Sequence, residues 1–355
     1  MSAIEKASEN KLGWILMILA FLGLTALVVS HFTDAAELLK TLKEANPIWI
    51  AAGTVLHILY FVAYAVLYKI GFNTVEVKGK MLHLLPLMMA SIFIRAVVPS
   101  GGATAAALFV DDAVQRGQSG PKATIGVVLV LLMDLLTLIP FILWGLVFLM
   151  RGDAFRWYDG LGIGIFLAYI GVMLGMLVLA YRESPAVIRF LVFIEHWVNW
   201  IGAKFHRPHW LPDEWPQSTA DQFKQASHAL VSQPKNLVLL TGWGIVLHAI
   251  NLAGLWALVK AFGQSVPIGG LVAAFGMGII FFVIGVIPEG IAIVETVMTL
   301  VFTAVGISKG TAIAITMVFR GVNFWLPIAV GLFTFGRIRR FGERSSHQKK
   351  QETPA

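Results

Sequence analysis

Residues 97–112 read VVPSGGATAAALFVDD, and they interrupt an otherwise apolar segment that also carries Arg95. A proline, a serine and two glycines stand where a membrane helix would place large apolar side chains. The whole chain is 57% hydrophobic and 13% charged, with a mean hydropathy of +0.78. A bilayer-spanning helix needs about 20 apolar residues, and six segments are long enough: 13–30, 47–70, 122–149, 160–181, 236–262 and 311–335. We therefore expect an all-α polytopic membrane protein.

The interruption occurs twice in the chain. Pro99-Ser100-Gly101 matches Pro288-Glu289-Gly290 at an offset of 189 residues, and the same offset relates Gly117-Gln118-Ser119 to Gly306-Ile307-Ser308 and Asp134 to Asn323. We interpret the chain as two copies of one unit, residues 47–149 and 236–338, each made of a span, a broken helix pair and a span. The spans 13–30 and 160–181 are additional. Because one span separates the copies, the second would be inverted, and inverted repeats with interrupted helices are typical of secondary transporters.

The broken pairs allow two topologies. Residues 81–98 and 102–115 either cross the membrane as two short spans or enter and return as a re-entrant hairpin. We favour the hairpin, because the second segment is short and because exposed backbone at the tip is tolerated only against protein or a wet cavity. The tips near Gly101 and Gly290 would then approach each other near the midplane. Each tip begins a helix, and the free N–H groups of a helix start suit an anion such as phosphate.

Ionisable side chains lie inside the apolar segments. Such a side chain costs roughly 2.5–3.5 kcal/mol on insertion scales, so it usually has a function. We expect Arg95 and Arg320 to bind a lipid phosphate, and the alternative is a structural ion pair with Asp134, Glu289 or Glu295. Asp134, roughly 18 Å into its span, would pair with an arginine, carry a proton or contact a cationic headgroup. The predicted substrate-binding residues are Arg95, Ser100, Gly101, Gly102, Glu289, Gly290, Glu295 and Arg320, and the predicted coupling or charge-balancing residues are Asp134 and Asn323.

The distribution of basic residues predicts the orientation. Nineteen of the 27 Lys and Arg residues fall on the side that holds both termini, and six fall on the other. This asymmetry places both termini in the cytoplasm of a bacterial or archaeal inner membrane. Residues 183–235, which are rich in tryptophan and basic residues, would form a cytoplasmic interfacial segment of this single membrane domain, residues 1–355. Residues 339–355 would form a disordered cytoplasmic tail.

Several chemistries find no support in the sequence. The chain has no cysteine, no phosphate-binding P-loop, no G-x-S-x-G elbow and no H-E-x-x-H motif. We expect no enzyme activity, no cofactor and no metal site, and we interpret His57 and His248 as buried polar residues rather than metal ligands. The formal net charge of +7 is assigned to loops that face anionic lipid rather than to nucleic-acid binding.

Two longer segments resemble one family. The segment VVPSGGATAAALFVDDAVQRGQSGPKATIGVVLVLLMDLL and the segment IPEGIAIVETVMTLVFTAVGISKGTAIAITMVFRGVNFWLPIAVGLF resemble the two motif regions of the lysylphosphatidylglycerol synthase transmembrane (flippase-like) family. The match is specific at Pro288, Gly290, Glu295, Arg320 and residues 324–327 (FWLP). Glu289 replaces a usual glycine, and Leu131 and Leu132 stand where many relatives carry Glu-Arg. The family is similar to the membrane half of the multiple peptide resistance factor, whose soluble aminoacyl-transferase domain has no counterpart in this sequence.

The resemblance implies translocation of a lipid rather than its synthesis. We expect an anionic or aminoacylated phospholipid, or another phosphate-headgroup lipid, as the partner. A separate aminoacyl- or glycosyl-transferase and a homodimer are both compatible with the sequence. Two other functions stay open: a proton-coupled transporter of a small solute, and a non-transporting membrane partner of a lipid or glycan transferase.

Overall fold

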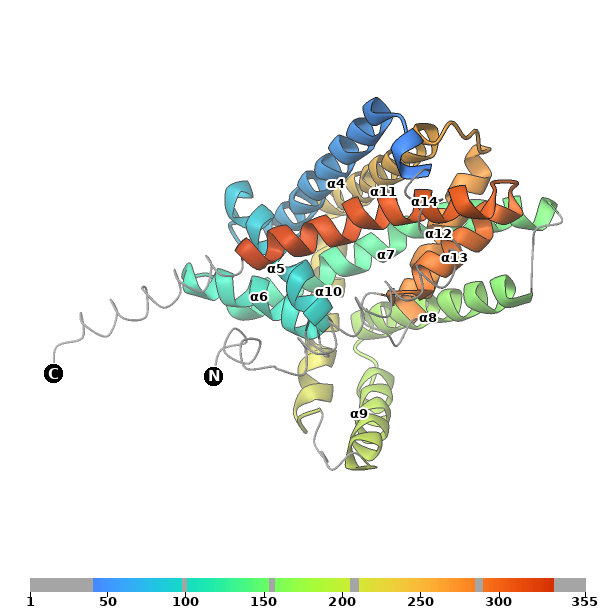
Figure 1. Ribbon diagram of the computed structural model, residues 1–355. Coiled ribbons are helices and arrows are strands. Elements are labelled where there is room, and N and C mark those ends of the chain that lie inside the picture. Colours follow the sequence, from blue (N-terminus) through green and yellow to red (C-terminus); the bar gives the residue numbers. More distant parts are fainter. Residues whose placement is uncertain (1–40, 98–100, 153–156, 205–210, 285–289, 335–355) are drawn as a thin grey trace.

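The computed structural model describes residues 41–97, 101–152, 157–204, 211–284 and 290–334 (Figure 1). These residues form helices and no strand. The helices are α4 (Pro47–Thr74), α5 (Met81–Val97), α6 (Gly101–Gln115), α7 (Gly120–Arg151), α8 (Trp157–Tyr181), α9 (Ala186–Lys204), α10 (Trp215–Ser232), α11 (Pro234–Ala261), α12 (Ile268–Ile284), α13 (Ile293–Ala304) and α14 (Lys309–Arg320), followed by a π-helical turn, Gly321–Trp325. The predicted all-α fold class is confirmed.

Five helices of the described chain are long and apolar enough to cross a membrane. They cover 47–74, 120–151, 162–181, 234–261 and 309–334, and they correspond to five of the six predicted spans. The sixth, 13–30, lies outside the described residues, as does the predicted tail, 339–355. The broken pairs are also present as short helices, α5 with α6 and α12 with α13, and both predicted tip sequences fall largely outside the described residues.

The two halves of the chain share local structure at matching positions. The helices α4 to α7 and the helices α11 to α14 begin at offsets of 187–192 residues. Gly117 and Gly306 both have a positive φ, +75° and +97°, which favours glycine. The side chains of Ser119 and Ser308 accept hydrogen bonds from the backbone N–H groups of Lys122 and Thr311, three residues later. These bonds cap the starts of α7 and α14. The sequence equivalence therefore corresponds to an equivalent turn and cap.

The helices α4 and α11 pack side by side in opposite directions (Figure 1). The Asn46 N–H donates to the Ala261 carbonyl at 2.7 Å, and the Gln233 side chain donates to the Thr74 carbonyl at 3.0 Å. The start of each helix therefore lies beside the end of the other. Close approach is possible because Gly53 and Gly254 stand at the contact. Antiparallel α4 and α11 are what inverted repeats would produce, and the inversion of one whole half relative to the other stays a prediction.

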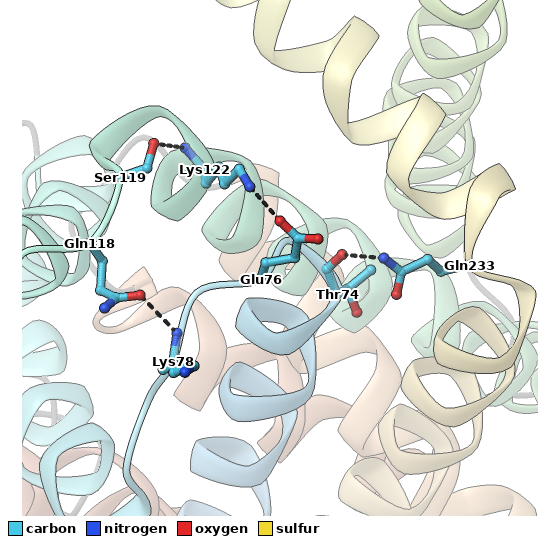
Figure 2. A network of polar contacts seen from close by, with 7 residues as sticks. All are labelled: Thr74, Glu76, Lys78, Gln118, Ser119, Lys122 and Gln233. Atoms are coloured by element: carbon cyan, nitrogen blue, oxygen red, sulfur yellow. Dashed lines mark hydrogen bonds and ion pairs between the residues drawn. The ribbon is translucent and has the colours of Figure 1, made fainter.

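Figure 2 shows the polar network that joins helix ends at one face of the bundle. Lys122 at the start of α7 binds Glu76 after α4 at 2.5 Å, and the Gln118 side chain accepts the Lys78 N–H at 3.2 Å. The hydrogen bond from Lys122, and then its charge, lower the pKa of Glu76. Arg116 at the end of α6 also donates to the Lys78 carbonyl at 2.6 Å. The α5–α6 pair therefore begins and ends at the same face, as both a re-entrant hairpin and a pair of spans require.

Two hydrophobic clusters hold the bundle together. One contains most of α4, α5 and the first half of α7, and the other contains the second half of α7 with α12, α13 and α14. On α7 the residues up to Met133 belong to the first cluster, and those from Leu138 onward belong to the second. Asp134 lies at the change between them. The junction of the two clusters therefore positions the polar residues of the site.

The segment 183–235 contains two helices, α9 and α10, as expected for an interfacial segment. Met176 and Ala180 of α8, Val187 and Leu191 of α9, and Ala220 of α10 form a small cluster of their own. The helix α9 extends away from the main bundle (Figure 1) and exposes Phe193, Trp197 and Trp200. An exposed aromatic face suits a membrane surface, and this location of α9 stays a prediction.

Candidate functional site

A cavity of about 170 Å³ lies where α4, α5, α7, α11, α12, α13 and α14 meet. Its polar lining consists of Tyr60, Tyr64, Arg95, Asp134, His248, Asn251, Arg320 and Asn323, and five phenylalanines, Phe61, Phe275, Phe282, Phe319 and Phe324, are part of its apolar lining. Polar groups gathered inside so apolar a bundle indicate a binding site rather than an ordinary core.

The cavity lies deep in the membrane-spanning bundle. Arg95, Asp134 and His248 each lie 14 residues after the start of their helix, about 21 Å along it. Arg320 lies 11 residues after the start of α14, about 17 Å along it. This helix starts from the opposite face of the bundle, because its Ala314 packs near Phe262, just after the end of α11. Since the hydrocarbon core is about 30 Å thick, these distances from both faces place the cavity near mid-depth.

Asp134 is held by two neighbouring helices. The Tyr64 hydroxyl of α4 donates to one carboxylate oxygen of Asp134 at 3.1 Å. His248 Nε2 of α11 lies 3.5 Å from the other carboxylate oxygen and 2.9 Å from the Asp134 main-chain oxygen. A carboxylate, an imidazole and a phenol in contact form a group that can hold or pass a proton.

Arg320 forms a buried ion pair with Glu295 of α13. Its Nε donates to Glu295 Oε1 at 2.6 Å, and both side chains are only 8% exposed. The guanidinium carbon also lies 4.2 Å from the centre of the Phe324 ring, so the ring and the carboxylate together fix the orientation of the guanidinium. Arg320 thus forms the ion pair with Glu295 that the sequence left open as the alternative to phosphate binding, and it also lines the cavity.

Arg95 reaches the cavity from the end of α5, beside the first predicted tip. It lies 5.9 Å from the centre of the Phe282 ring, which is near the end of α12. The last turns of the first helix of each broken pair therefore meet at the cavity. Arg95 is half-buried, and it lies close enough to Asp134 to interact with it electrostatically.

Asn323 and Asn251 join the two ends of the second half. The Asn323 side chain donates to Asn251 Oδ1 at 3.1 Å, and Asn323 lies in the π-helical turn that follows Arg320. A π-turn inserts one extra residue per turn, and such turns are frequent at functional sites. Here the turn places both Arg320 and Asn323 on the cavity side of the same helix.

The structure brings five of the ten predicted residues together at one cavity. Arg95, Asp134, Arg320 and Asn323 line one cavity, and Glu295 contacts it through Arg320. Gly290 has a φ of +61° and packs on Phe282, and a Cβ there would lie 3.2 Å from the Phe282 Cα. Gly101 and Gly102 lie at the start of α6. Ser100 and Glu289 lie outside the described residues.

Sequence reasoning missed four lining residues, Tyr60, Tyr64, His248 and Asn251. Each pair, 60 with 64 and 248 with 251, has helical spacing and therefore shares one face of an apolar span. This spacing could have indicated which face of each span lies inside the protein, because two polar side chains on one face of a span seldom point to lipid. His57, by contrast, is not among the lining residues. Its Nδ1 lies 2.7 Å from the Gly53 carbonyl oxygen, and its ring contacts that of Phe319, which lines the cavity. In the described parts of the chain, no three His, Asp or Glu side chains cluster closely enough to hold a metal ion.

Comparison with known proteins adds the family. The family model described as the lysylphosphatidylglycerol synthase TM region matches residues 14–331, nearly the whole chain. The chain belongs to this family. It is also similar to two UPF0104 membrane proteins. One, from Methanothermobacter thermautotrophicus, is 19% identical over 331 residues, which cover 90% of this chain and 94% of the relative. The other, from Pyrococcus horikoshii, is 20% identical over 318 residues, which cover 88% and 94%. Family and helices together make the protein a multi-pass membrane protein.

Proposed function

We propose that the protein moves a phosphate-headgroup lipid, such as an anionic or aminoacylated phospholipid, between the leaflets of the inner membrane without altering it chemically. The observation that carries the proposal is the approach of two guanidinium groups, Arg95 and Arg320, to one cavity near mid-depth. A phosphate fits the geometry of a guanidinium group and binds it through paired, charge-assisted hydrogen bonds. Membership of the lysylphosphatidylglycerol synthase TM family supports a lipid as the substrate.

The size and composition of the cavity suit a headgroup rather than a whole lipid. A volume of about 170 Å³ accommodates a phosphate and the atoms next to it, and the acyl chains would stay in the surrounding bilayer. The charges that approach the cavity, Arg95, Arg320, Asp134 and Glu295, balance when His248 is neutral. The cavity itself therefore carries little uncompensated charge at mid-depth, where such charge is costly, and an aminoacylated headgroup would bring its own positive charge to balance its phosphate.

The two halves give a means of moving the headgroup. Broken helices that end at a shared cavity are the parts that move or open in transporters with repeated halves. Rocking of α4–α7 against α11–α14 would open the cavity to one leaflet and then to the other. The π-turn at Gly321–Trp325 interrupts the regular hydrogen bonding of α14 beside Arg320, and this is where we expect that helix to bend.

Transport of a fluorescent phospholipid into the inner leaflet of proteoliposomes tests the proposal. We expect Arg95→Gln to reduce the protein-dependent rate at least tenfold, and Glu295→Gln/Arg320→Gln to do the same without leaving a buried charge unpaired. Arg151→Gln is the matched control, because Arg151 is an exposed arginine at the end of α7 that does not line the cavity. Equal rates in the wild type and in both cavity variants would overturn the proposal.

The Asp134–His248 contact favours a second candidate, a proton-coupled transporter of a small solute. A buried carboxylate and imidazole 3.5 Å apart can exchange a proton with a passing substrate. A solute-dependent proton current in proteoliposomes, with no protein-dependent lipid movement, would select this function over lipid translocation.

A further inference from the structure

A second and larger cavity lies on the other side of α7. It is a groove of about 640 Å³ between α7, α8, α10 and α11, within the range of about 300–1,000 Å³ typical of ligand sites. Most of its lining is apolar and includes Leu136, Pro140, Leu174, Val178, Leu237 and Ile245. Polar side chains, Tyr181, Arg182 and Ser227, gather where α8 ends. We call this cavity the α8 groove.

The α8 groove runs from one face of the bundle into its middle. On α8 the lining extends from Arg182 back to Leu174, and on α11 it extends from Leu237 to Ile245. Each stretch covers nine residues, about 12 Å of helix from the first to the last. The lining residues of α7, from Met133 to Pro140, lie near the middle of that helix. Since half of the hydrocarbon core measures about 15 Å, the groove spans most of one leaflet.

The shallow end of the groove carries a positive charge. Arg182 is exposed there, whereas the nearby Lys224 is paired with Glu183 at 2.8 Å. The Ser227 hydroxyl donates to the Lys224 carbonyl at 2.7 Å, and the Tyr181 ring lies 5.0 Å from that of His228. The α8 groove is apolar along most of one leaflet and has a guanidinium at its shallow end. It is therefore complementary to a phospholipid that places an acyl chain in the groove and its phosphate at the interface.

We propose that the α8 groove binds a phospholipid, with one acyl chain between α8 and α11 and its phosphate on Arg182. A single helix separates this lipid from the central cavity. Thr137 lines the groove, Asp134 lines the cavity, and the Thr137 hydroxyl donates to the Asp134 carbonyl at 3.2 Å. Gly244 of α11 packs on Thr137, so closely that a Cβ would lie 2.5 Å from its hydroxyl oxygen. The groove would thus hold a lipid beside the translocation site, a role that rests on the proposed function, whereas lipid binding itself does not.

Photocrosslinking of the full chain in nanodiscs tests the groove. The probe is a phosphatidylglycerol with a diazirine in one acyl chain, and a diacylglycerol with the same chain is the phosphate-free control. We expect crosslinks on 174–182 and 237–245, at least fivefold weaker in Val178→Trp, which fills the groove. Val172→Trp is the matched control, because Val172 is also an exposed valine of α8 but does not line the groove. Arg182→Gln should weaken labelling by phosphatidylglycerol at least threefold and leave labelling by diacylglycerol unchanged.

The outcomes separate the groove from the proposed function. Equal labelling of Val178→Trp and Val172→Trp would overturn the proposal of a lipid in the groove. Equal labelling by phosphatidylglycerol and diacylglycerol, in both the wild type and Arg182→Gln, would also overturn it. Loss of a dimer in Val178→Trp with unchanged labelling would assign the surface to a second copy and also overturn it. Groove labelling as expected, in a wild-type protein that moves no lipid, would support the groove and reject lipid translocation. Unchanged translocation in a Val178→Trp protein that has lost its labelling would reject the role beside the translocation site.

Discussion

The two halves of the molecule share a scaffold and differ in their charges. Glu295 and Arg320 of the second half form a buried pair, while the residues at the same offset in the first half, Ala106 and Leu131, are apolar, and Leu131 is exposed. The first half instead supplies Arg95, whose counterpart is Ile284. One half thus carries a fixed pair, and the other carries a guanidinium close to a carboxylate at the cavity. The two halves share one fold, but they contribute different charged groups to the two sides of the cavity.

Arg320→Ala should have the largest effect on stability. Removing one partner of a buried ion pair leaves the other charge unpaired, at a cost of about 3–5 kcal/mol. Arg95→Ala should cost far less, because Arg95 is only half-buried. Thermal unfolding in detergent measures both. The double variant Glu295→Leu/Arg320→Met should recover most of the stability without recovering transport, and equal losses in the two single variants would remove the contrast between the halves.

Asp134→Asn should reduce lipid transport by about tenfold, equivalent to about 1.4 kcal/mol in the barrier. The amide keeps the shape of the side chain and loses the charge that faces Tyr64 and His248. Adding Asn323→Asp, at the equivalent position of the second half, should not restore the rate, because Asn323 faces Asn251 instead. The same proteoliposome assay measures the single and the double variant, and full activity in the double variant would show that the carboxylate works equally well from either half.

The turns before α7 and α14 should respond alike. Gly117→Ala and Gly306→Ala each force a side chain into a left-handed backbone conformation, at a cost of about 1–2 kcal/mol. Neither glycine has a neighbouring atom within 4 Å of an added Cβ, so the cost is one of backbone conformation in both. Unfolding temperatures that fall by different amounts would contradict the equivalence of these turns.

Lys122→Gln should have the smallest effect, confined to the first half. The second half has Ser265 and Thr311 where the first has Glu76 and Lys122. Because Lys122 lowers the pKa of Glu76 in the folded state, the pair stabilises the fold above the ordinary glutamate pKa of about 4.3. This contribution is lost as the pH falls through the lower folded pKa. The unfolding temperatures of the wild type and Lys122→Gln should therefore differ slightly at pH 7 and converge in acid.

The sequence was enough to predict the helices and most of the charged residues of the site. Apolar length predicted the five described spans, and the rarity of charge in such segments selected Arg95, Asp134, Glu295 and Arg320. The offset of 189 residues added Asn323, although nothing local to it indicates a function. The helix prediction succeeded because the bilayer restricts the backbone, and the selected charges meet at one cavity because the bilayer also restricts where charge can be placed, while their role in binding stays a prediction.

The sequence did not predict the contacts of Asp134, the π-turn or the α8 groove. The contacts and the groove depend on which face of a helix meets which neighbouring helix. His248 and Tyr64 reach Asp134 because α11 and α4 both pack against α7. The spacing of the polar residues on α4 and α11 indicates which face of each helix points inward, but it does not indicate which helix that face meets. The π-turn at 321–325 escaped prediction because its residues are ordinary for an α-helix. The α8 groove depends on the approach of α10, a helix outside both repeats.

An electron cryomicroscopy map of the protein in phospholipid nanodiscs, enlarged by a bound antibody fragment, tests the central claim most directly. We predict phosphate density in the central cavity, within hydrogen-bonding distance of the Arg95 and Arg320 guanidinium groups. A cavity that holds only water, with every lipid phosphate at the membrane surfaces and both arginines contacting protein alone, would contradict it.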